Sequence, residues 1–290
     1  MTTATQHLRK LGGDSQCHLL RCDDGKCYAT KMLGNPQGDR ILVNEWVAAK
    51  ILDRLGIPVP RVAVITVTAE FLAANPEIAF GYGHGRVEIR PGEHFGSEWI
   101  VKDPDQQRTY DFIPDSLLAA VANLRDFLGM LCADTWLGNV DGRQVAFARV
   151  DGQFWGWFID HGYIFDGPHW DFQDAPLCGL YHRPMVYGQA RSWADFELWL
   201  GRIEHFRPAE LRRIAASVPA AWLPYQDREL LDGLIEGLVG RRKMVRGLVL
   251  AAIEHVGRGN PAWAGLTPRP VVGRATGGGT LPTPNCPGGG

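Results

Sequence analysis

The sequence lacks both a long apolar run and a large excess of charge. No stretch is uncharged and long enough to span a bilayer, and the first ten residues, MTTATQHLRK, contain no apolar segment typical of a secretion signal. The 30 Lys and Arg residues nearly balance the 32 Asp and Glu residues, which leaves a formal net charge of -2. We therefore expect a cytoplasmic protein that binds no membrane and has no direct affinity for nucleic acid.

The sequence also lacks the spacing of a structural metal site or a disulfide framework. Cys17, Cys22 and Cys27 repeat at intervals of five, whereas zinc sites pair cysteines more closely and add a second pair or histidines. A disulfide framework is typical of small secreted domains, not of a chain of 290 residues without a secretion signal. We therefore expect reduced thiols, with these three cysteines on a β-hairpin.

What the sequence does contain is enough apolar material for a large core. Hydrophobic residues make up 45% of the 290 residues, which suffices for two lobes or one large domain. We predict an α+β fold with a small β-rich N-lobe carrying one helix at 5–104, a larger and mainly helical C-lobe at 105–256, and a cleft between them. The remaining residues, 257–290, are rich in Gly and Pro and are expected to form a disordered tail.

Turn residues and apolar spacing place the elements of the N-lobe. An Asp-Asp-Gly triplet between two strand-like runs predicts a hairpin within residues 16–33. A glycine turn at 12–13 precedes it. Apolar residues recur at helical spacing over 40–55, and a Gly and a Pro follow that would end this helix. Residues 61–67 read as another strand.

The second half of the chain reads as helical, with one hairpin inside it. Apolar residues at helical spacing predict one helix from Asp115 or Ser116 to Cys132. Residues 144–160 read as a hairpin because Asp-Gly, a favoured two-residue turn, lies in the middle. From Ser192 the pattern is helical almost to the tail.

A glycine turn and a strand lysine near the N-terminus suit the binding of a triphosphate. Phosphoryl transfer needs the triphosphate to be positioned, its charge neutralised and the nucleophile oriented. The turn from Gly12 and Gly13 to Ser15 can bring backbone N–H groups close to phosphate, because glycine has no side chain in the way. Lys31 shares a strand face with Ala29, two residues earlier, and its ammonium can hold phosphate oxygens.

Four acids and amides further along the chain suit the other requirements. Glu45, on the inward face of the predicted helix, can pair with Lys31 and hold it in place. Asp134 would accept the proton of the substrate hydroxyl or orient that hydroxyl, as a general base does. Asn139 and Asp160 would be ligands of Mg²⁺, since this hard cation prefers oxygen donors.

Several of these motifs resemble those of protein kinases. YATK at 28–31 resembles the strand-three Val-Ala-Ile-Lys, Asp134 with Asn139 resembles the catalytic loop, and Asp-His-Gly at 160–162 resembles Asp-Phe-Gly. The last two motifs in tandem are most similar to those of the HipA-like kinases and their phosphoinositide-kinase-like relatives, over about residues 5–250. The resemblance implies a bilobal, protein-kinase-like fold that uses Mg²⁺ and ATP, in the cytoplasm.

The same motifs depart from the kinase pattern in three ways. The glycine turn has no full Gly-x-Gly-x-x-Gly, Cys132 and Ala133 stand in place of His-Arg, and no Ala-Pro-Glu motif follows. The acceptor therefore stays open between a protein Ser or Thr, which the resemblance favours, and a small molecule or lipid headgroup. A catalytically silent nucleotide-binding regulator and nucleotidyl transfer are the further alternatives.

Each motif also has a purely structural interpretation. Gly12 and Gly13 can form a mere turn, and Asp141 with Gly142 reads as a turn too, which leaves Asp141 outside the catalytic set. Arg143 is interpreted first as an anchor of its loop and only second as a phosphate ligand. The hypothesis of a kinase depends on the order in which the candidates occur together, not on any one of them.

Overall fold

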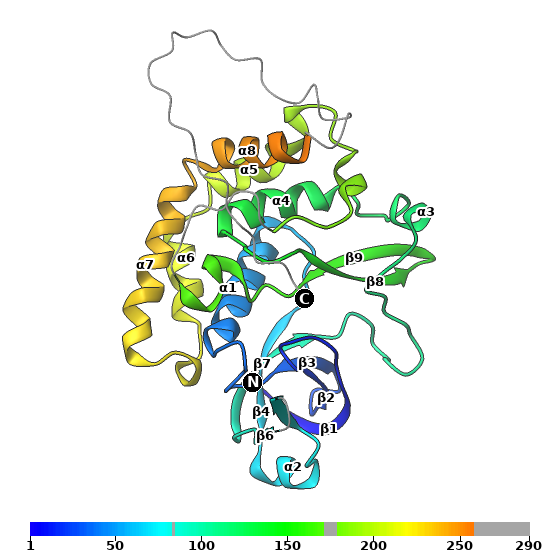
Figure 1. Ribbon diagram of the computed structural model, residues 1–290, viewed down its shortest axis with the longest axis vertical. Helices are drawn as coiled ribbons and strands as arrows, with labels where there is room; N and C mark the ends of the chain where they lie inside the picture. The colour runs from blue at the N-terminus through cyan, green and yellow to red at the C-terminus, as the bar shows by residue number, and fades with distance from the viewer. Residues whose placement is uncertain (83–84, 171–178, 258–290) are drawn as a thin grey trace.

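The computed structural model describes residues 1–82, 85–170 and 179–257, and the predicted tail lies outside the described residues from 258 onward. The first part of the chain forms a closed β-barrel with the strand order β1-β2-β3-β7-β4 (Figure 1). Its strands are β1 (Thr2–Lys10), β2 (His18–Cys22), β3 (Cys27–Lys31), β4 (Val62–Val67) and β7 (Gly92–Glu98). Parallel pairing of β1 with β4 closes the barrel, and the other neighbours are antiparallel.

The predicted hairpin is confirmed as β2 and β3, and its turn has the geometry that the sequence demands. Gly25 adopts φ 78, a left-handed conformation that glycine tolerates without strain. Cys22 and Cys27 lie on the two strands, and every cysteine of the described residues is buried and free of disulfide bonds. Cys17, also expected on the hairpin, lies directly before β2.

Before residue 105 the sequence predicted one helix, and the structure has two. The predicted helix is confirmed as α1 (Arg40–Leu55), which ends at Gly56 in a left-handed conformation. The second helix, α2 (Ala69–Ala74), begins where the Thr68 hydroxyl accepts a hydrogen bond from the Phe71 N–H, the cap that the apolar pattern did not reveal. A two-stranded sheet of β5 (Ala79–Tyr82) and β6 (Gly85–Glu88) follows α2.

The single helix predicted from Asp115 or Ser116 to Cys132 is wrong. The structure has α3 (Asp115–Leu118) and, after a non-helical segment, α4 (Asp126–Leu137). The intervening segment pairs with a strand instead: the Asn123 side chain exchanges two hydrogen bonds of 2.9 Å with the backbone of Gly156. These tertiary contacts outweigh the local helical pattern.

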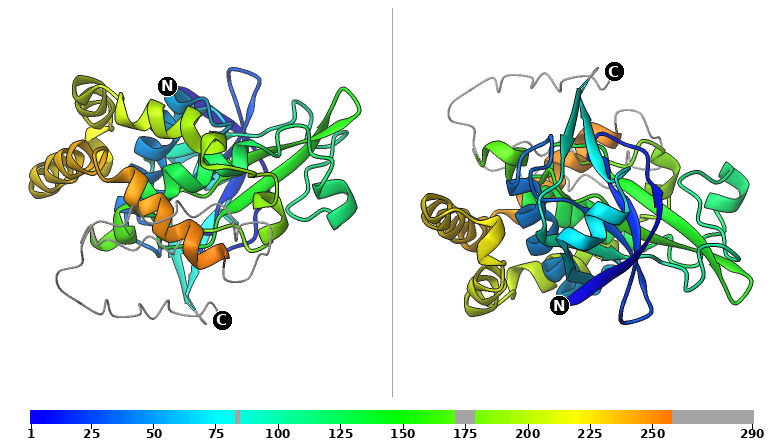
Figure 2. Two further views of the ribbon diagram at one scale, coloured as in Figure 1. Left: turned by 90° about the horizontal axis from the view of Figure 1, so that it is seen from above. Right: turned by 90° about the horizontal axis from the view of Figure 1, so that it is seen from below.

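The predicted second hairpin is confirmed as β8 (Gln144–Val150) and β9 (Gln153–Ile159). Positive φ angles at both turn residues, Asp151 and Gly152, are those of a tight two-residue turn. The hairpin projects to the side of the molecule opposite α7 (Tyr225–Arg241) in views from above and below (Figure 2).

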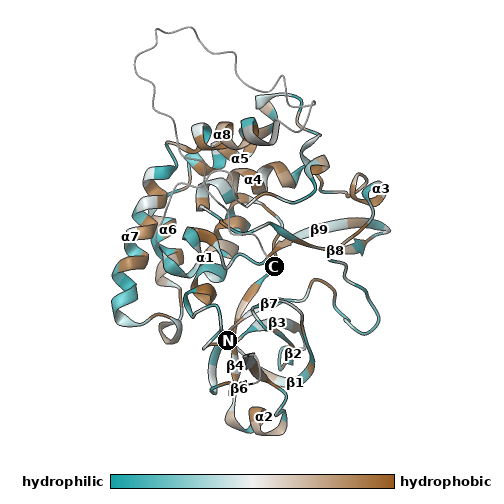
Figure 3. Ribbon diagram, viewed as in Figure 1, coloured by the Kyte–Doolittle hydropathy of each residue, from teal (hydrophilic) through white to brown (hydrophobic). Residues whose placement is uncertain are grey.

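Helices make up most of the remaining structure. They are α5 (Glu197–Glu204), α6 (Pro208–Ala216), α7 and α8 (Val245–Gly257), with 3-10 helices η1 (Ile164–His169), η2 (Pro184–Tyr187), η3 (Trp193–Phe196) and η4 (Ala220–Trp222). One buried apolar cluster joins α1, α4 and the later helices to Phe95 of the barrel, while a smaller cluster fills the barrel itself. Hydrophobic segments accordingly alternate with hydrophilic ones around these helices (Figure 3). Of the helices that the structure describes, none combines the length and the apolar character needed to cross a bilayer.

The contact between α4 and α5 requires a glycine at position 129. A Cβ atom built there would lie 2.3 Å from Nε1 of Trp199, a buried and rigid side chain. We expect Gly129→Ala to lower the free energy of unfolding by about 1–3 kcal/mol through overpacking. Chemical denaturation measures this change.

Gly233→Ala is the matched control on α7. Its added methyl group would meet no atom within 4 Å, and the residue is exposed. Because alanine favours a helix over glycine, this variant should gain roughly 0.5–1 kcal/mol. Equal stability of the two variants would contradict the close packing of α4 against α5.

Candidate functional site

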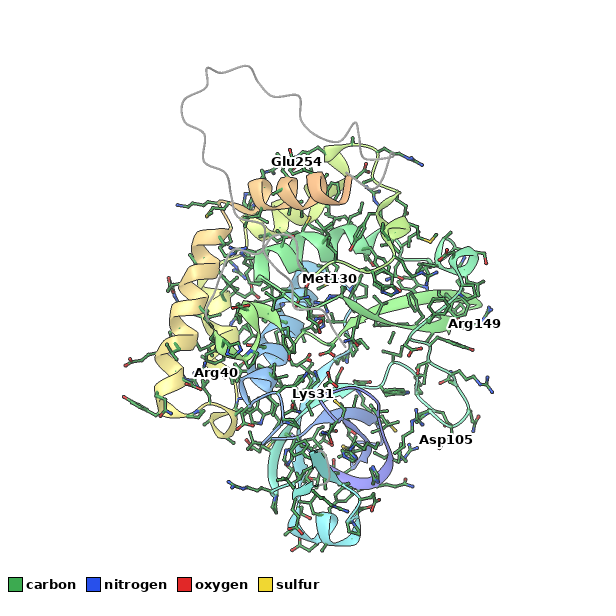
Figure 4. The ribbon with its side chains drawn as sticks, in the orientation of Figure 1. Lys31, Arg40, Asp105, Met130, Arg149 and Glu254 are labelled. Atoms are coloured by element: carbon green, nitrogen blue, oxygen red, sulfur yellow. The ribbon has the colours of Figure 1, made fainter. Side chains whose placement is uncertain are left out.

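The side chain of Lys31 is buried at the end of β3 and contacts two acids. Its Nζ lies 2.5 Å from Oε1 of Glu45 on α1 and 2.7 Å from Oδ1 of Asp160, which follows β9. The contact predicted between Lys31 and Glu45 is therefore present. Burial alone would lower the pKa of Lys31, but Asp160 and Glu45 raise it well above its ordinary value, so the side chain is an ammonium. Figure 4 labels Lys31 where the barrel meets the helical part.

Asp160 is held from several sides. Its φ of 58 is unusual for a residue with a side chain and turns the chain sharply at the end of β9. Its second oxygen, Oδ2, accepts a hydrogen bond of 3.0 Å from Nε2 of Gln144, at the start of β8. Burial raises the pKa of Asp160, but the attraction of Lys31 and its hydrogen bond outweigh burial and lower the value to about 2. Asp160 is therefore a carboxylate at any physiological pH.

These groups line a cavity of about 380 Å³ between the barrel and the helical part. The predicted residues on its wall are Gly12, Ser15, Ala29, Lys31, Glu45 and Asp160. The wall also includes apolar side chains, among them Val62, Phe95 and Ile100. A cavity of this size, apolar with a few convergent polar groups, is typical of a small-molecule site.

The glycine turn between β1 and β2 is open toward solvent. A Cβ at Gly12 or Gly13 would meet no atom within 4 Å, and Gly13 adopts φ 98. The turn is fixed at its far end, where the backbone oxygen of Ser15 accepts a bond of 2.9 Å from Asn35. Gly12 lines the cavity, whereas Gly13 is not among its lining residues.

The structure does not place Asp134 at the cavity. It lies inside α4, not beyond the helix end, and 2% of its surface is exposed. Arg143 donates to both carboxylate oxygens, at 2.9 Å to Oδ2 and 2.6 Å to Oδ1. Burial raises the pKa of Asp134 while Arg143 opposes that rise. The carboxylate of Asp134 thus neutralises a buried guanidinium.

Asn139, the predicted metal ligand, is also away from the cavity wall. Its Nδ2 donates to Oδ1 of Asp134 at 3.0 Å, and its Oδ1 accepts from the backbone N–H of Asp141 at 3.2 Å. With 1% of its surface exposed, the amide is used at both ends inside the loop. Asn139 therefore links Asp134 to the backbone of Asp141.

Asp141 is the exposed acid of this loop. Its Oδ1 accepts from the N–H of Gly142 at 2.7 Å, in an exposed turn. Burial first, and then the charges of Asp141 and Asp160, raise the pKa of Tyr163. The two acids therefore lie near the same phenol, although the sequence patterns assigned no role to Asp141.

The contacts of Arg143 confirm the interpretation of this residue as an anchor of its loop. Besides Asp134, its guanidinium donates to the backbone oxygens of Ile159 and Asp160, at 2.8 and 3.1 Å, and contacts Nδ1 of His161 at 3.0 Å. It is buried and absent from the cavity wall. Arg143 thus joins the predicted catalytic loop to the Asp-His-Gly motif.

Helix α1 holds the segment that follows this motif. The Asn44 amide donates to the backbone oxygens of Gly162, Ile164 and Gly167, at 2.7, 3.1 and 3.1 Å, and accepts a bond from the indole of Trp170. A Cβ at Gly162 would lie 2.6 Å from the Ile41 side chain, so this glycine permits the close approach.

Gln144 is a polar cavity residue to which sequence reasoning assigned no role. It lines the wall, is exposed and contacts Asp160, and it ends the stretch that carries Asp134 and Asn139. The predicted hairpin did contain the signal, because a two-residue turn at Asp151 and Gly152 sets Gln144 opposite Ile159. The register alone thus places Gln144 beside Asp160, which follows Ile159.

Comparison with known proteins supports a kinase-like fold. Residues 7–144 match the family described as HipA-like kinase. A solved structure of the Helicobacter pylori proinflammatory kinase CtkA is similar with a TM-score of 0.52 at 15% sequence identity, over 86% of this chain and 98% of that chain. The structure of hydra Fam20 with sugar is similar with a TM-score of 0.52 at 13% identity, over 90% of this chain and 87% of that chain.

At these identities the structural likeness concerns the fold alone, which is a mixed α/β, protein-kinase-like fold. No curated protein sequence matches the chain. The matched segment contains the glycine turn, Lys31, Glu45, Asp134 and Asn139, while Asp160 lies beyond it. The match of residues 7–144 to this family model confirms the resemblance that the motifs indicated, over that segment of the chain.

Proposed function

We propose that this protein is a kinase that binds ATP with Mg²⁺ in a cleft between a small β-rich lobe and a larger helical lobe. It would transfer the γ-phosphoryl group to a hydroxyl, and the acceptor we propose is a Ser or Thr of a protein; the match to the HipA-like kinase family supports the kinase activity. The observation that carries the proposal is the contact of Lys31 with Glu45 and Asp160 on the wall of one cavity.

The cavity offers separate surroundings for the two ends of a nucleotide. The ammonium of Lys31 and the open glycine turn at Gly12 provide charge and backbone N–H groups for the phosphates. The apolar wall at Val62 and Ile100 suits the base. Glu45 keeps Lys31 in place, since an unpaired ammonium at this depth would be costly to bury.

The donor set fits a hard divalent cation at Asp160. Its carboxylate is ionised, because its pKa is about 2, and both of its oxygens face cations or donors. When bound there, Mg²⁺ would neutralise charge on the phosphates. Asn139, proposed from sequence as the second ligand, would have to leave two hydrogen bonds inside its loop to reach the metal.

For the acceptor side we propose Asp141 in place of Asp134. Asp141 is exposed, whereas the carboxylate of Asp134 is engaged by Arg143. In transfer, the acceptor hydroxyl would give its proton to Asp141 while the hydroxyl oxygen forms a bond to the γ-phosphorus. The bond between that phosphorus and the bridging oxygen of the β-phosphate would break, which releases ADP. Asp134 would position this acid through Asn139.

A second candidate is a nucleotide-binding regulator without transferase activity. The observation that favours it is the bidentate contact of Arg143 with Asp134, which engages both oxygens of the acid of the kinase-like pattern. In that case the cavity would bind nucleotide but no phosphoryl group would leave it.

Labelled ATP distinguishes these functions. The full-length protein is incubated with Mg²⁺ and γ-labelled or α-labelled ATP in a lysate of its own cells. We expect γ-label in a protein band; γ-label in a lipid or metabolite would instead assign the small-molecule alternative. Label from α-labelled ATP would indicate nucleotidyl transfer. No label from a protein that binds Mg-ATP would favour the silent regulator.

Nucleotide binding should depend on the divalent cation. We expect Mg-ATP at about a hundredfold excess over Kd to stabilise the protein by roughly 2.7 kcal/mol, which corresponds to about 5–10 °C in Tm for a chain of this size. ATP with a chelator should raise Tm much less, because Asp160 then faces the phosphates without a compensating charge. Thermal unfolding measures both shifts, and no shift with millimolar Mg-ATP would contradict the proposed function.

Two conservative substitutions separate the two acids of the loop. Asp141→Asn should lower kcat by roughly 10²–10⁴-fold with an unchanged Tm, as expected for a lost general base. Asp134→Asn should instead lower the free energy of unfolding by about 3 kcal/mol or more, because it leaves the Arg143 guanidinium buried without its counter-charge. Steady-state kinetics and denaturation are measured on both variants.

The reverse result would restore the assignment made from sequence. If Asp141→Asn keeps full turnover while Asp134→Asn loses turnover at unchanged stability, Asp134 is the base and must leave Arg143 in the active state.

A further inference from the structure

The carboxylate of Asp160 is shared between Lys31 and Gln144. Nζ of Lys31 lies 2.7 Å from Oδ1, and Nε2 of Gln144 lies 3.0 Å from Oδ2. The hairpin fixes this arrangement, since Gln144 pairs with Ile159 in the β8–β9 register and Asp160 follows directly. Gln144 is exposed, and both Gln144 and Asp160 line the cavity.

A cation beside Asp160 needs further oxygen donors from the protein, and acids do not supply them. The described residues contain no group of three or more His, Cys, Asp or Glu side chains placed to hold a metal ion. Glu45, the other acid at this end of the cavity, has its Oε1 against Lys31. A carboxamide is therefore the donor to look for, and Mg²⁺ accepts amide oxygens.

Asn139 and Gln144 are carboxamides that bond to the candidate acids Asp134 and Asp160, and they differ in availability. Asn139 is almost completely buried, and both ends of its amide are bonded within the loop. Gln144 is exposed and already touches the carboxylate of Asp160. A half-turn about the last side-chain torsion would bring its Oε1 to the position that Nε2 now occupies.

We propose that Gln144 is a metal-ligating residue that acts together with Asp160 and takes the part assigned to Asn139 by the sequence pattern. This inference rests on the proposed function, because it presumes a divalent cation with the nucleotide. Without metal, the amide N–H group faces Asp160, because an ionised carboxylate can accept hydrogen bonds but cannot donate them. With metal, Oε1 faces the cation, and the lost contact with Asp160 is replaced by coordination.

The competing role for Gln144 is that of a donor that only orients Asp160. The two roles predict different rankings of metal affinity among variants at this position. A ligand needs an oxygen, so Gln144→Glu should bind metal at least as tightly as the wild type, and Gln144→Met should bind it more weakly. A pure donor needs an N–H, so Gln144→Glu and Gln144→Met should be equally impaired.

Mn²⁺ binding to the full-length protein in the presence of ADP tests this order. Mn²⁺ is the probe because its free form is counted directly by electron paramagnetic resonance. We expect Gln144→Met to weaken Mn²⁺ binding by about tenfold or more. Loss of a residue that only supports a metal ligand already lowers metal affinity by about tenfold. Gln144→Glu should match or exceed the wild type. The Tm of Gln144→Met without metal should equal that of the wild type, which excludes a folding defect.

Gln153 provides the matched controls. It is exposed at the first position of β9, at the far end of the same hairpin, and lines no part of the cavity. Gln153→Met and Gln153→Glu should bind Mn²⁺ as the wild type does. If the Gln144 variants behave like these controls, or if Gln144→Glu is as weak as Gln144→Met, Gln144 is not a ligand while the proposed kinase stands. A wild-type protein that binds no Mn²⁺ with ADP would overturn both.

Discussion

The buried ammonium of Lys31 is the charge on which the arrangement of the cleft depends. It joins three elements that are distant in the sequence, because β3 supplies the lysine, α1 supplies Glu45 and the end of β9 supplies Asp160. Removing one partner of a buried ion pair leaves an uncompensated charge, at a cost of about 3–5 kcal/mol. The ion pairs of Lys31 therefore couple the barrel to the helical part, since a substitution that removes one partner leaves the other buried without its counter-charge.

The acids at the polar end of the cavity differ in charge state. Burial raises the pKa of Glu45, whereas Lys31 holds the pKa of Asp160 at about 2, so that Asp160 is ionised beside the ammonium. Its other oxygen accepts a hydrogen bond from the neutral Gln144. A carboxylate in this position attracts a cation and repels a bare triphosphate. The same electrostatics therefore favour a nucleotide that arrives with its metal ion.

Much of the fold was predictable because it depends on local signals. The hairpins follow from their turn residues, and α1 follows from its apolar spacing and the glycine at its end. The break between α3 and α4 was not predictable, since it depends on Asn123 binding the backbone of Gly156, a contact between residues far apart in the chain. Local propensity carries no information on such a contact.

The candidate site shows the same division. The pairing of Lys31 with Glu45 was foreseen from a strand face and a helix face. A pattern of Asp and Asn five residues apart could not reveal that both side chains point into the protein, since burial is decided by Arg143 and by the packing of α4. Gln144 was within reach of sequence reasoning, because the hairpin register that places it beside Asp160 follows from the turn.

Helix α1 ties the two sides of the cleft into one thermodynamic unit. Adjacent residues on this helix hold different partners, since Glu45 holds Lys31 of the barrel while Asn44 holds three backbone oxygens of the segment after Asp160. A displacement of α1 that loosened one set of contacts would strain the other. Contacts that hold the lysine are thus coupled through α1 to those that hold the segment from Gly162 to Gly167. If a ligand of the proposed nucleotide site stabilises this segment, a partner that orders the segment strengthens the binding of that ligand by the same coupling free energy.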